Sequence, residues 1–394
     1  MHVGLVSTTY RPRRGGLETH VTTLAEHLAG AGHQVTVLTN RDSPQQPADT
    51  WENGVRVLRG GVLLQPLDPN AVPWERGLFA VLDDFAPLAD AQPDVVHTHT
   101  QAALLLTSMS GLAETVPVVA SFHETRPEAE PGGWPRSRFV ARTCTPTLVL
   151  AGSWAFARQA ESFGYPAERI RTVHLGVPHR PRVHDRRAAR HLLAQAAGVP
   201  TDGLLIALTG RYTPRKAQHR LLDAYELTST RADCRVVLLG STNGSDAAYL
   251  RYVADRAARH GDRVTLLTDQ DDAVRDLLAE AADLVTQPST AEGLGLAVIE
   301  FMQHGAPAVV SDIDGLNEVV TRDAGRLVDT ADPAAYAAAL DELAASTTLR
   351  AHTGRAAADR ATRYFGTARS VANTTSAYIE AINAARPVVG AARV

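Results

Sequence analysis

The sequence has almost no lysine and almost no cysteine. Among its 39 basic residues Lys216 is the only lysine, and all the others are arginine. The two cysteines, Cys144 and Cys234, are far apart and lack the spacing of a metal site, which fits a reducing cytoplasm. Since arginine is used everywhere else, the one lysine indicates a position where a compact ammonium is needed and a planar guanidinium is not.

Long apolar runs are also missing. No stretch approaches the roughly 18 apolar residues of a membrane span, and the first residues, MHVGLVSTTY, do not place a charged leader before an apolar core. We therefore expect no transmembrane segment, no signal peptide and a cytoplasmic location. The net charge of −4 gives no overall attraction to nucleic acid or to an anionic membrane, and nucleic acid is not an expected partner.

What is present is a regular alternation of strand and helix patterns. A chain of 394 residues with 44% hydrophobic content is expected to form two globular domains. The alternation occurs in both halves, which predicts the α/β class with two doubly wound, Rossmann-like domains. The predicted strands are 2–7, 34–39, 55–58, 94–98, 116–121, 148–151 and 171–174, then 204–209, 235–239, 264–267, 283–286, 308–311 and 325–328.

The first half opens with a strand, a glycine pair at Gly15-Gly16 and an amphipathic helix over 17–29. Doubly wound folds place ligand phosphates at this first turn, although the motif is not G-x-G-x-x-G and a purely structural turn fits equally well. Histidines lie at the ends of two later strands, namely His97 with His99, and His123. A structural role is the expected one for His97 and His99, whereas a functional role is favoured for His123.

Three loops rich in proline, glycine and tryptophan, over 42–54, 65–77 and 124–142, are candidate walls of a substrate site. In the third loop the carboxylates Glu124, Glu128 and Glu130 would suit an acceptor that carries an amine. The arginines of the same loop would suit a phosphorylated acceptor; they are Arg126, Arg136, Arg138 and Arg142.

The stretch 179–200 is basic, rich in histidine and without a strand pattern. It is interpreted as an interdomain connection that ends in a short helix, with a solvated charged face rather than a nucleic-acid patch. The second half then starts with a strand followed by Gly210-Arg211 and Lys216. An arginine and a lysine in this first turn could hold a diphosphate, the arginine bidentately and the lysine as a point charge.

A second glycine turn, Gly293-Leu294-Gly295, joins the strand 283–286 to a helix that starts at Leu296. Backbone amides and the helix dipole at such a turn favour an anion. Glu292 and Glu300 flank the turn with seven residues between them, so both could accept hydrogen bonds from sugar hydroxyls. The alternative is that Glu292 is only an acid near a helix start and Glu300 a satisfied core carboxylate.

Together these features resemble the retaining GT-B glycosyltransferases of family GT4, also called glycosyl transferases group 1. The resemblance covers essentially the whole chain, in the family's order. It rests on Gly15-Gly16, His97, His123, Gly210-Arg211, Lys216, Glu292, Glu300, the segment PAVVSD at 307–312 and Asn317-Glu318. It implies two facing Rossmann-like domains and a C-terminal helix that crosses back to the first domain. The candidate is 368–385, and the alternative is a helix that packs only on the second domain.

The resemblance also implies roles. A nucleotide-sugar donor would bind mainly to the second domain and an acceptor mainly to the first. Arg211 and Lys216 would neutralise the diphosphate, Glu300 would hold the ribose, Glu292 would hold the donor sugar, and His123 would lie near the anomeric carbon. The implied donor-binding set is Gly15, Gly16, Gly210, Arg211, Lys216, Glu292, Gly293, Leu294, Gly295, Leu296 and Glu300. The candidate acceptor residues are His97 and, from the third loop and not from the resemblance, Glu124, Arg126 and Trp134. Retention by front-face attack requires no covalent intermediate, and neither a cofactor nor a metal is expected.

Departures from the family pattern leave the substrates open. Leu294 stands where the family commonly has phenylalanine, and Asp314-Gly315 where it has two glycines. Asp312-Ile-Asp314 is a literal D-x-D, interpreted as a coincidence. The expectation is transfer of a hexosyl group from a UDP-linked sugar to a small, soluble acceptor, in natural-product or in small-thiol or aminocyclitol biosynthesis of a bacterium.

The expected domains are an acceptor domain over 1–178, the connection 179–200, a donor domain over 201–366, and the returning helix with its tail over 367–394. Two other functional classes fit the same fold. An epimerase would release an altered sugar nucleotide or sugar without an acceptor, and a non-catalytic nucleotide-sugar-binding protein would keep only the phosphate site.

Overall fold

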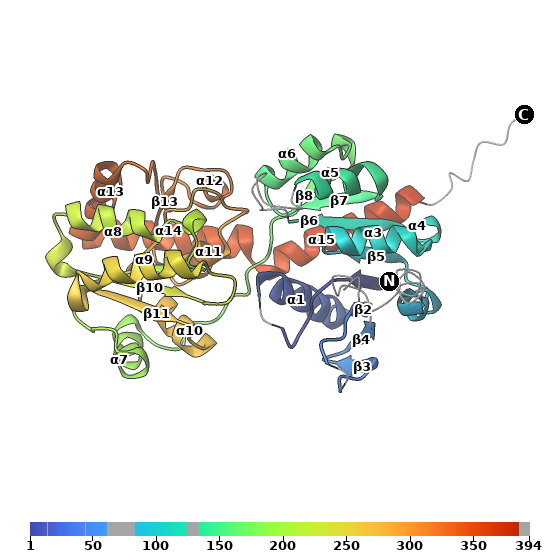
Figure 1. The fold of residues 1–394 in the computed structure, drawn as a ribbon, viewed down its shortest axis with the longest axis horizontal. Helices are drawn as coiled ribbons and strands as arrows, with labels where there is room; N and C mark the ends of the chain where they lie inside the picture. The colour runs from blue at the N-terminus through green and yellow to red at the C-terminus, as the bar shows by residue number, and fades with distance from the viewer. Residues whose placement is uncertain (14, 44, 61–82, 124–133, 386–394) are drawn as a thin grey trace, which may run out of the picture. The chain divides into compact units, whose positions relative to one another are not determined.

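The computed structural model describes the chain except residues 14, 44, 61–82, 124–133 and 386–394 (Figure 1). The chain forms two compact units. Unit 1 comprises Met1–Gly176 together with Thr367–Val394, and unit 2 comprises Val177–Gly366. Each unit is described by itself below.

Unit 1 is built on an eight-stranded sheet with the order β3-β4-β2-β1-β5-β6-β7-β8. All neighbouring strands are parallel except β3 and β4. The strands are β1 (His2–Val6), β2 (Gln34–Asn40), β3 (Asp49–Glu52), β4 (Val55–Gly60), β5 (Val95–Thr98), β6 (Val118–Phe122), β7 (Leu148–Ala151) and β8 (Ile170–Thr172). The helices are α1 (Gly16–Gly30), α3 (Gln101–Met109), α4 (Leu112–Thr115), α5 (Trp134–Thr143), α6 (Trp154–Phe163) and α15 (Thr367–Ala385).

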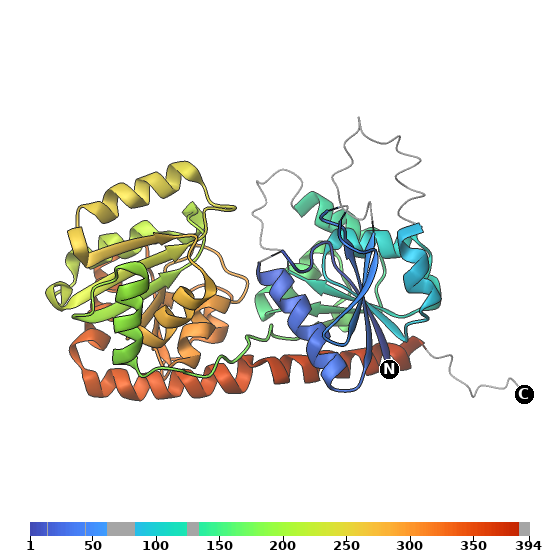
Figure 2. The same ribbon diagram turned by 90° about the horizontal axis from the view of Figure 1, so that it is seen from below.

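The sequence explains this arrangement. Every residue of β1 and of β5 is buried, as expected for parallel strands that are covered by helices on both faces. In α1 the predicted apolar face is buried, and it consists of Val21, Leu24, Ala25 and Leu28. The long C-terminal helix α15 packs against α1 and the β5–β7 strands (Figure 2). Its buried residues Ala377, Tyr378 and Ala381 join the same core as the α1 face, so the predicted return of this helix to the first domain is confirmed.

Unit 2 is built on a six-stranded parallel sheet with the order β11-β10-β9-β12-β13-β14. Its strands are β9 (Leu204–Thr209), β10 (Cys234–Gly240), β11 (Val264–Thr268), β12 (Leu284–Gln287), β13 (Ala308–Ser311) and β14 (Gly325–Val328). Its helices are α7 (Arg186–Ala197), α8 (Gln218–Leu227), α9 (Ala247–Ala258), α10 (Asp272–Ala281), α11 (Leu296–Gln303), α12 (Leu316–Val319), α13 (Pro333–Ala345) and α14 (Thr347–Phe365). The fold class predicted from the sequence is thus confirmed in both units.

Two of the predicted loops are partly wrong. The segment 42–54 contains β3, which forms a hairpin with β4 through Asn53 (φ 50°) and Gly54 (φ 79°). An Asn-Gly pair with two positive φ angles is the favoured turn for such a hairpin, so the sequence did carry this signal. The end of the third loop is the helix α5, while 65–77 and 124–133 lie outside the described residues. Among the helices that are described, none is long and apolar enough to cross a membrane.

Candidate active site

The strand orders locate the place where each sheet is expected to bind ligands. In a doubly wound sheet, this place lies beyond the carboxyl ends of the two strands at which the order reverses. The reversal falls between β1 and β5 in unit 1, and between β9 and β12 in unit 2. The predicted residues Arg211 and Lys216 follow β9, and Glu292 follows β12, so the fold of unit 2 brings their segments to one edge of its sheet.

Lys216 and Glu292 form a partly buried ion pair. The Lys216 Nζ lies 2.5 Å from Glu292 Oε1, and the two side chains are only 15% and 7% exposed. The same carboxylate oxygen accepts a hydrogen bond of 2.6 Å from Ser289 Oγ, and the Arg215 guanidinium lies 3.9 Å from the other oxygen. Burial by itself would raise the pKa of Glu292, but Lys216, Ser289 and Arg215 together hold it below its ordinary value. Glu292 is therefore an anion that fixes the position of the only lysine.

The turn after β9 is shaped around Lys216. A Cβ added at Gly210 would lie 3.4 Å from the aliphatic part of the Lys216 side chain, so the glycine lets this side chain lie against the main chain. The Thr290 amide donates to the Arg215 carbonyl at 2.9 Å, which connects the segment after β9 to the segment after β12. Arg211 is exposed and has no carboxylate partner within the described part of the chain.

The second glycine turn is tightly packed and depends on glycines at which a side chain would clash. Gly295 precedes α11 with φ +87°, and a Cβ at this position would lie 2.6 Å from Leu316 Cδ2. Gly293, Leu294 and Gly295 are buried, and Leu296 is the first residue of α11. A side chain at Gly315 would meet the carbonyl oxygen of Glu292 at 2.7 Å, so this glycine lets the following loop pack on the turn.

Glu300 lies one turn into α11 and has a partner that the sequence did not suggest. Arg275 from α10 donates to Glu300 Oε1 at 2.9 Å. Burial raises the pKa of Glu300 above its ordinary value, and Arg275 opposes this shift only in part. Arg275 precedes Glu300 by 25 residues, and no motif or spacing in the sequence links the two.

In unit 1 three histidines converge near the ends of β5, β6 and the start of α1. One ring nitrogen each from His20, His99 and His123 lies within 4.8 Å of the others. Both ring nitrogens of His99 and of His123 are buried and without a hydrogen-bond partner among the described residues. Burial lowers the pKa of His20 to about 4 and that of His123 to about 3, so both imidazoles are neutral near pH 7 and could accept a hydrogen bond or a metal ion. Sequence reasoning missed His20, which lies one helical turn after Gly16.

His97 differs from its neighbours. It is 1% exposed, and its two ring nitrogens lie 2.7 Å from Tyr378 Oη and 2.8 Å from Ser121 Oγ. These contacts join α15 to the sheet and favour the structural role over contact with an acceptor. Of the other predicted acceptor residues, Glu124 and Arg126 lie outside the described residues, and Trp134 is the first residue of α5.

The glycine pair of unit 1 lies at the start of α1, where Gly15 is in extended backbone and Gly16 is the first helical residue. A Cβ at Gly16 would meet no heavy atom within 4 Å, whereas one at Gly15 would meet Glu18 Oε2 at 2.3 Å. The amide end of α1 is therefore open at Gly16, as a close approach by a ligand requires.

Comparison with known proteins agrees with this architecture. Residues 14–180 match the family described as "Glycosyltransferase Family 4", and residues 190–360 match "Glycosyl transferases group 1". The chain is 31% identical to the D-inositol 3-phosphate glycosyltransferase of Xylanimonas cellulosilytica, over 93% of this chain and 92% of that protein. It is 30% identical to the GDP-mannose-dependent alpha-(1-6)-phosphatidylinositol dimannoside mannosyltransferase of Mycobacterium tuberculosis, over 84% of each chain.

Two solved structures share the fold at lower sequence identity. Sucrose-phosphate synthase from Thermosynechococcus elongatus has a TM-score of 0.78 at 21% identity and covers 98% of this chain and 100% of its own. HepE from Anabaena, in complex with UDP and glucose, has a TM-score of 0.74 at 19% identity, over 96% of this chain and 100% of its own. With both halves matched by the family and full-length relatives at this identity, the chain belongs to the family 4 glycosyltransferases of the GT-B fold.

Proposed function

We propose that the protein is a retaining, metal-independent hexosyltransferase that uses a UDP-linked sugar. In this proposal unit 2 binds the donor and unit 1 binds the acceptor. The observation that carries it is the Lys216 ammonium, fixed by Glu292 at 2.5 Å in the turn after β9, with Arg211 exposed in the same turn. The HepE structure that shares the fold holds UDP and glucose, which supports the choice of nucleotide.

The two cations account for the chemistry without a bound metal. As the bond between the sugar and the diphosphate breaks, negative charge grows on the leaving phosphate, and fixed positive groups stabilise it. Arg211 can hold two phosphate oxygens bidentately, while Lys216 acts as a point charge that is already positioned. The amides of Gly293 to Leu296 add hydrogen bonds at the start of α11, Glu300 accepts from the ribose, and Glu292 accepts from the donor sugar.

On the acceptor side the neutral imidazole of His123 is the group proposed to face the reacting hydroxyl. It offers an acceptor nitrogen that no described residue occupies. Several full-length relatives are D-inositol 3-phosphate glycosyltransferases, which supports a small, soluble, phosphorylated cyclitol as the acceptor. The relative that acts on a phosphatidylinositol dimannoside makes a lipid acceptor the competing choice.

Calorimetric titration with UDP, GDP and ADP tests the donor site first. We expect UDP to bind best and its affinity to fall at least about tenfold in Lys216→Ala, because a charge-assisted contact to the diphosphate is lost. Arg256→Ala is the matched control, since it also removes an ion-paired cation of unit 2, bonded to Asp223. Its UDP affinity should equal that of the wild type.

The outcome decides each part of the proposal separately. Tighter binding of GDP or ADP would reject UDP but keep the donor site, whereas equal binding by Lys216→Ala would reject the site itself. Once a donor is known, incubation with inositol phosphates followed by mass spectrometry tests the acceptor. The reaction is also run with excess EDTA, and the NMR spectra of donor and product are compared. The same anomeric configuration of the transferred sugar in both would support retention without a metal.

A further inference from the structure

A strongly basic groove lies on unit 2 at the edge opposite to the donor site. It consists of two cavities of about 650 and about 430 Å³ that share Arg186 and Arg350. The residues that line the first cavity include Gly203, Asp233 and Asp283. Each of them directly precedes the first residue of a strand, namely β9, β10 and β12 in that order. The groove is therefore at the amino ends of β9, β10 and β12, whereas Lys216 and Glu292 lie beyond the carboxyl ends.

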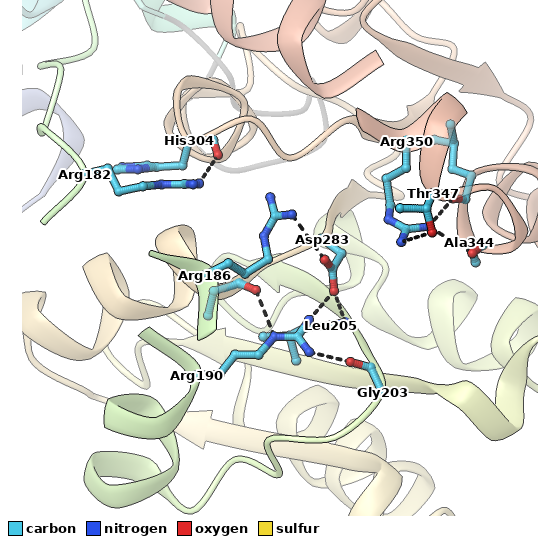
Figure 3. A network of polar contacts seen from close by, with 12 residues as sticks. Arg182, Arg186, Arg190, Gly203, Leu205, Asp283, His304, Ala344, Thr347 and Arg350 are labelled. Carbon is cyan, nitrogen blue, oxygen red and sulfur yellow. Dashed lines mark hydrogen bonds and ion pairs between the residues drawn. The ribbon is translucent and has the colours of Figure 1, made fainter. Parts of the chain in front are cut away.

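Six arginines line this groove against two aspartates. Arg186, Arg187 and Arg190 come from α7, Arg350 and Arg355 come from α14, and Arg182 comes from the segment before α7. The second cavity has no acidic residue in its lining and adds His179 and His304. Figure 3 shows Arg182, Arg186, Arg190 and Arg350 around this region, with Asp283 between the α7 arginines.

Only part of this charge is neutralised within unit 2. Asp283 forms ion pairs with both Arg190 and Arg186, and the Arg186 Nη1 lies 3.4 Å from Asp283 Oδ1. Among the described residues, Arg350 donates only to the carbonyls of Leu343 and Ala344 and to the Thr347 hydroxyl. Arg182 donates to the carbonyl of His304 at 2.5 Å. For Arg187 and Arg355 the described residues offer neither an ion pair nor a hydrogen bond.

Arg186 is at the centre of the excess charge. Its Nε is buried and makes no hydrogen bond to a described residue. Burial lowers the pKa of Arg186, Asp283 opposes the shift, and the charges of Arg182, Arg190 and Arg350 lower it further. A guanidinium crowded by three others, with an unused N–H, is stabilised when an anion enters.

We propose that the groove is a second anion site, separate from the donor site, for a ligand that carries phosphate groups. Several guanidinium forks around a hollow suit the oxygen atoms of a phosphate dianion or pyrophosphate better than a single carboxylate, which needs one cation. The ligand is a free phosphorylated metabolite or the phosphate headgroup of an anionic lipid, since both present the same chemistry. The groove and the donor-side glycine turn lie at the two ends of α11, which begins after Gly295 and ends before His304.

Titration with inorganic pyrophosphate tests the groove, in a Lys216→Ala background in which binding at the donor site is weakened. We expect this protein still to bind pyrophosphate at one site. Addition of Arg182→Gln and Arg355→Gln should weaken that binding at least about tenfold, because two charge-assisted contacts are lost. These two arginines are exposed and have no carboxylate partner among the described residues, so the variant should fold normally, which an unchanged Tm would verify.

The matched control changes Arg251 and Arg259 to glutamine in the same background. These are also exposed arginines of unit 2, on and just after α9, and they do not line the groove. Equal pyrophosphate affinity in the control and in the groove variant would overturn the proposal, as would absence of binding in the Lys216→Ala protein itself.

A flotation assay with phosphatidylcholine vesicles, with and without phosphatidylglycerol, then separates the two ligand sources. Binding only to the anionic vesicles, lost in the groove variant but not in the control, would support the lipid headgroup. Pyrophosphate binding without vesicle binding would support a free phosphorylated metabolite. Since nucleotide binding at the donor site is measured independently, failure of the groove leaves the proposed transferase activity unaffected.

Discussion

The Glu300 carboxylate shows how a single neighbouring residue can set the pH range in which a binding site functions. It is proposed to accept hydrogen bonds from ribose, which only the ionised form does fully. Burial raises its pKa, and Arg275 at 2.9 Å is the first of the groups that lower it. A carboxylate with a raised pKa is ionised at high pH and is lost as an acceptor when the pH falls through that pKa.

Replacement of Arg275 by methionine is therefore expected to move the pH dependence of nucleotide binding upward. With the cation removed, the pKa of Glu300 rises further, so affinity should drop at a higher pH than in the wild type. The measurement is the Kd of UDP between about pH 8 and about pH 5.5, where a loss of about tenfold at the acid end is expected. Arg326→Met, which breaks the Arg326–Glu342 pair in another part of unit 2, is the control. A pH profile unchanged by Arg275→Met would contradict this role of Arg275.

At the residue scale, the sequence identifies a candidate site residue only where a motif or the composition distinguishes it from the other residues of its type. Lys216 was identified because it is the only lysine, and its pairing with Glu292 makes it a fixed charge. Arg275 could not be identified, since one arginine among many carries no signal until the fold places it beside Glu300. The sequence leaves the role of His97 open, because its bond to Tyr378 joins residues that are 281 positions apart.

At the scale of elements, α11 and the turn before it depend on Gly295. Its φ of +87° is disfavoured for any residue with a Cβ, and Leu316 occupies the space that a Cβ would need. A substitution here must move either the start of α11 or the Leu316 side chain, which is buried against this turn. The backbone of this turn is thus part of the site even though it has no reactive group.

Gly295→Ala should weaken UDP binding by at least about tenfold and destabilise the protein by about 2 kcal/mol or more. Gly198→Ala provides the comparison, because Gly198 also has a positive φ, of +68°, but has open space around its Cβ position. Gly198→Ala should lower the free energy of unfolding by about 1 kcal/mol, because of the backbone strain alone, and should leave UDP binding intact. Calorimetry and urea unfolding measure both quantities. If the two variants lost UDP affinity equally, the contact with Leu316 would not matter for the site.

Buried helices and strands were easier to predict from the sequence than the short, partly exposed strand β3. Buried parallel strands such as β1 and β9 are continuous apolar runs, which the sequence displays directly. The short strand β3 lies in a segment whose proline, glycine and tryptophan content predicts a loop, and its residues, DTWE, contain no apolar run. It exists because β4 offers an antiparallel edge and Asn53-Gly54 makes the turn.

At the scale of the whole molecule, the two units should respond differently to acid. Unit 1 buries a set of neutral histidines, and burial lowers the pKa of His20, His97, His99 and His123. All four tryptophans of the sequence, at positions 51, 74, 134 and 154, belong to unit 1. Tryptophan fluorescence therefore reports the unfolding of this unit alone, within the intact chain.

Unfolded His20 takes up a proton near its ordinary pKa of 6.5, whereas folded His20 does so only near 4. Its contribution to stability is therefore complete above 6.5 and is lost as the pH falls toward 4. Between about pH 7.5 and about pH 5, His20→Gln should lose about 1–2 kcal/mol less of its unfolding free energy than the wild type, measured by urea titration of tryptophan fluorescence. His27→Gln, an exposed position on the same helix, should follow the wild type. Equal pH dependence in all three proteins would mean that solvent reaches His20 and that the histidine cluster is not held neutral by burial.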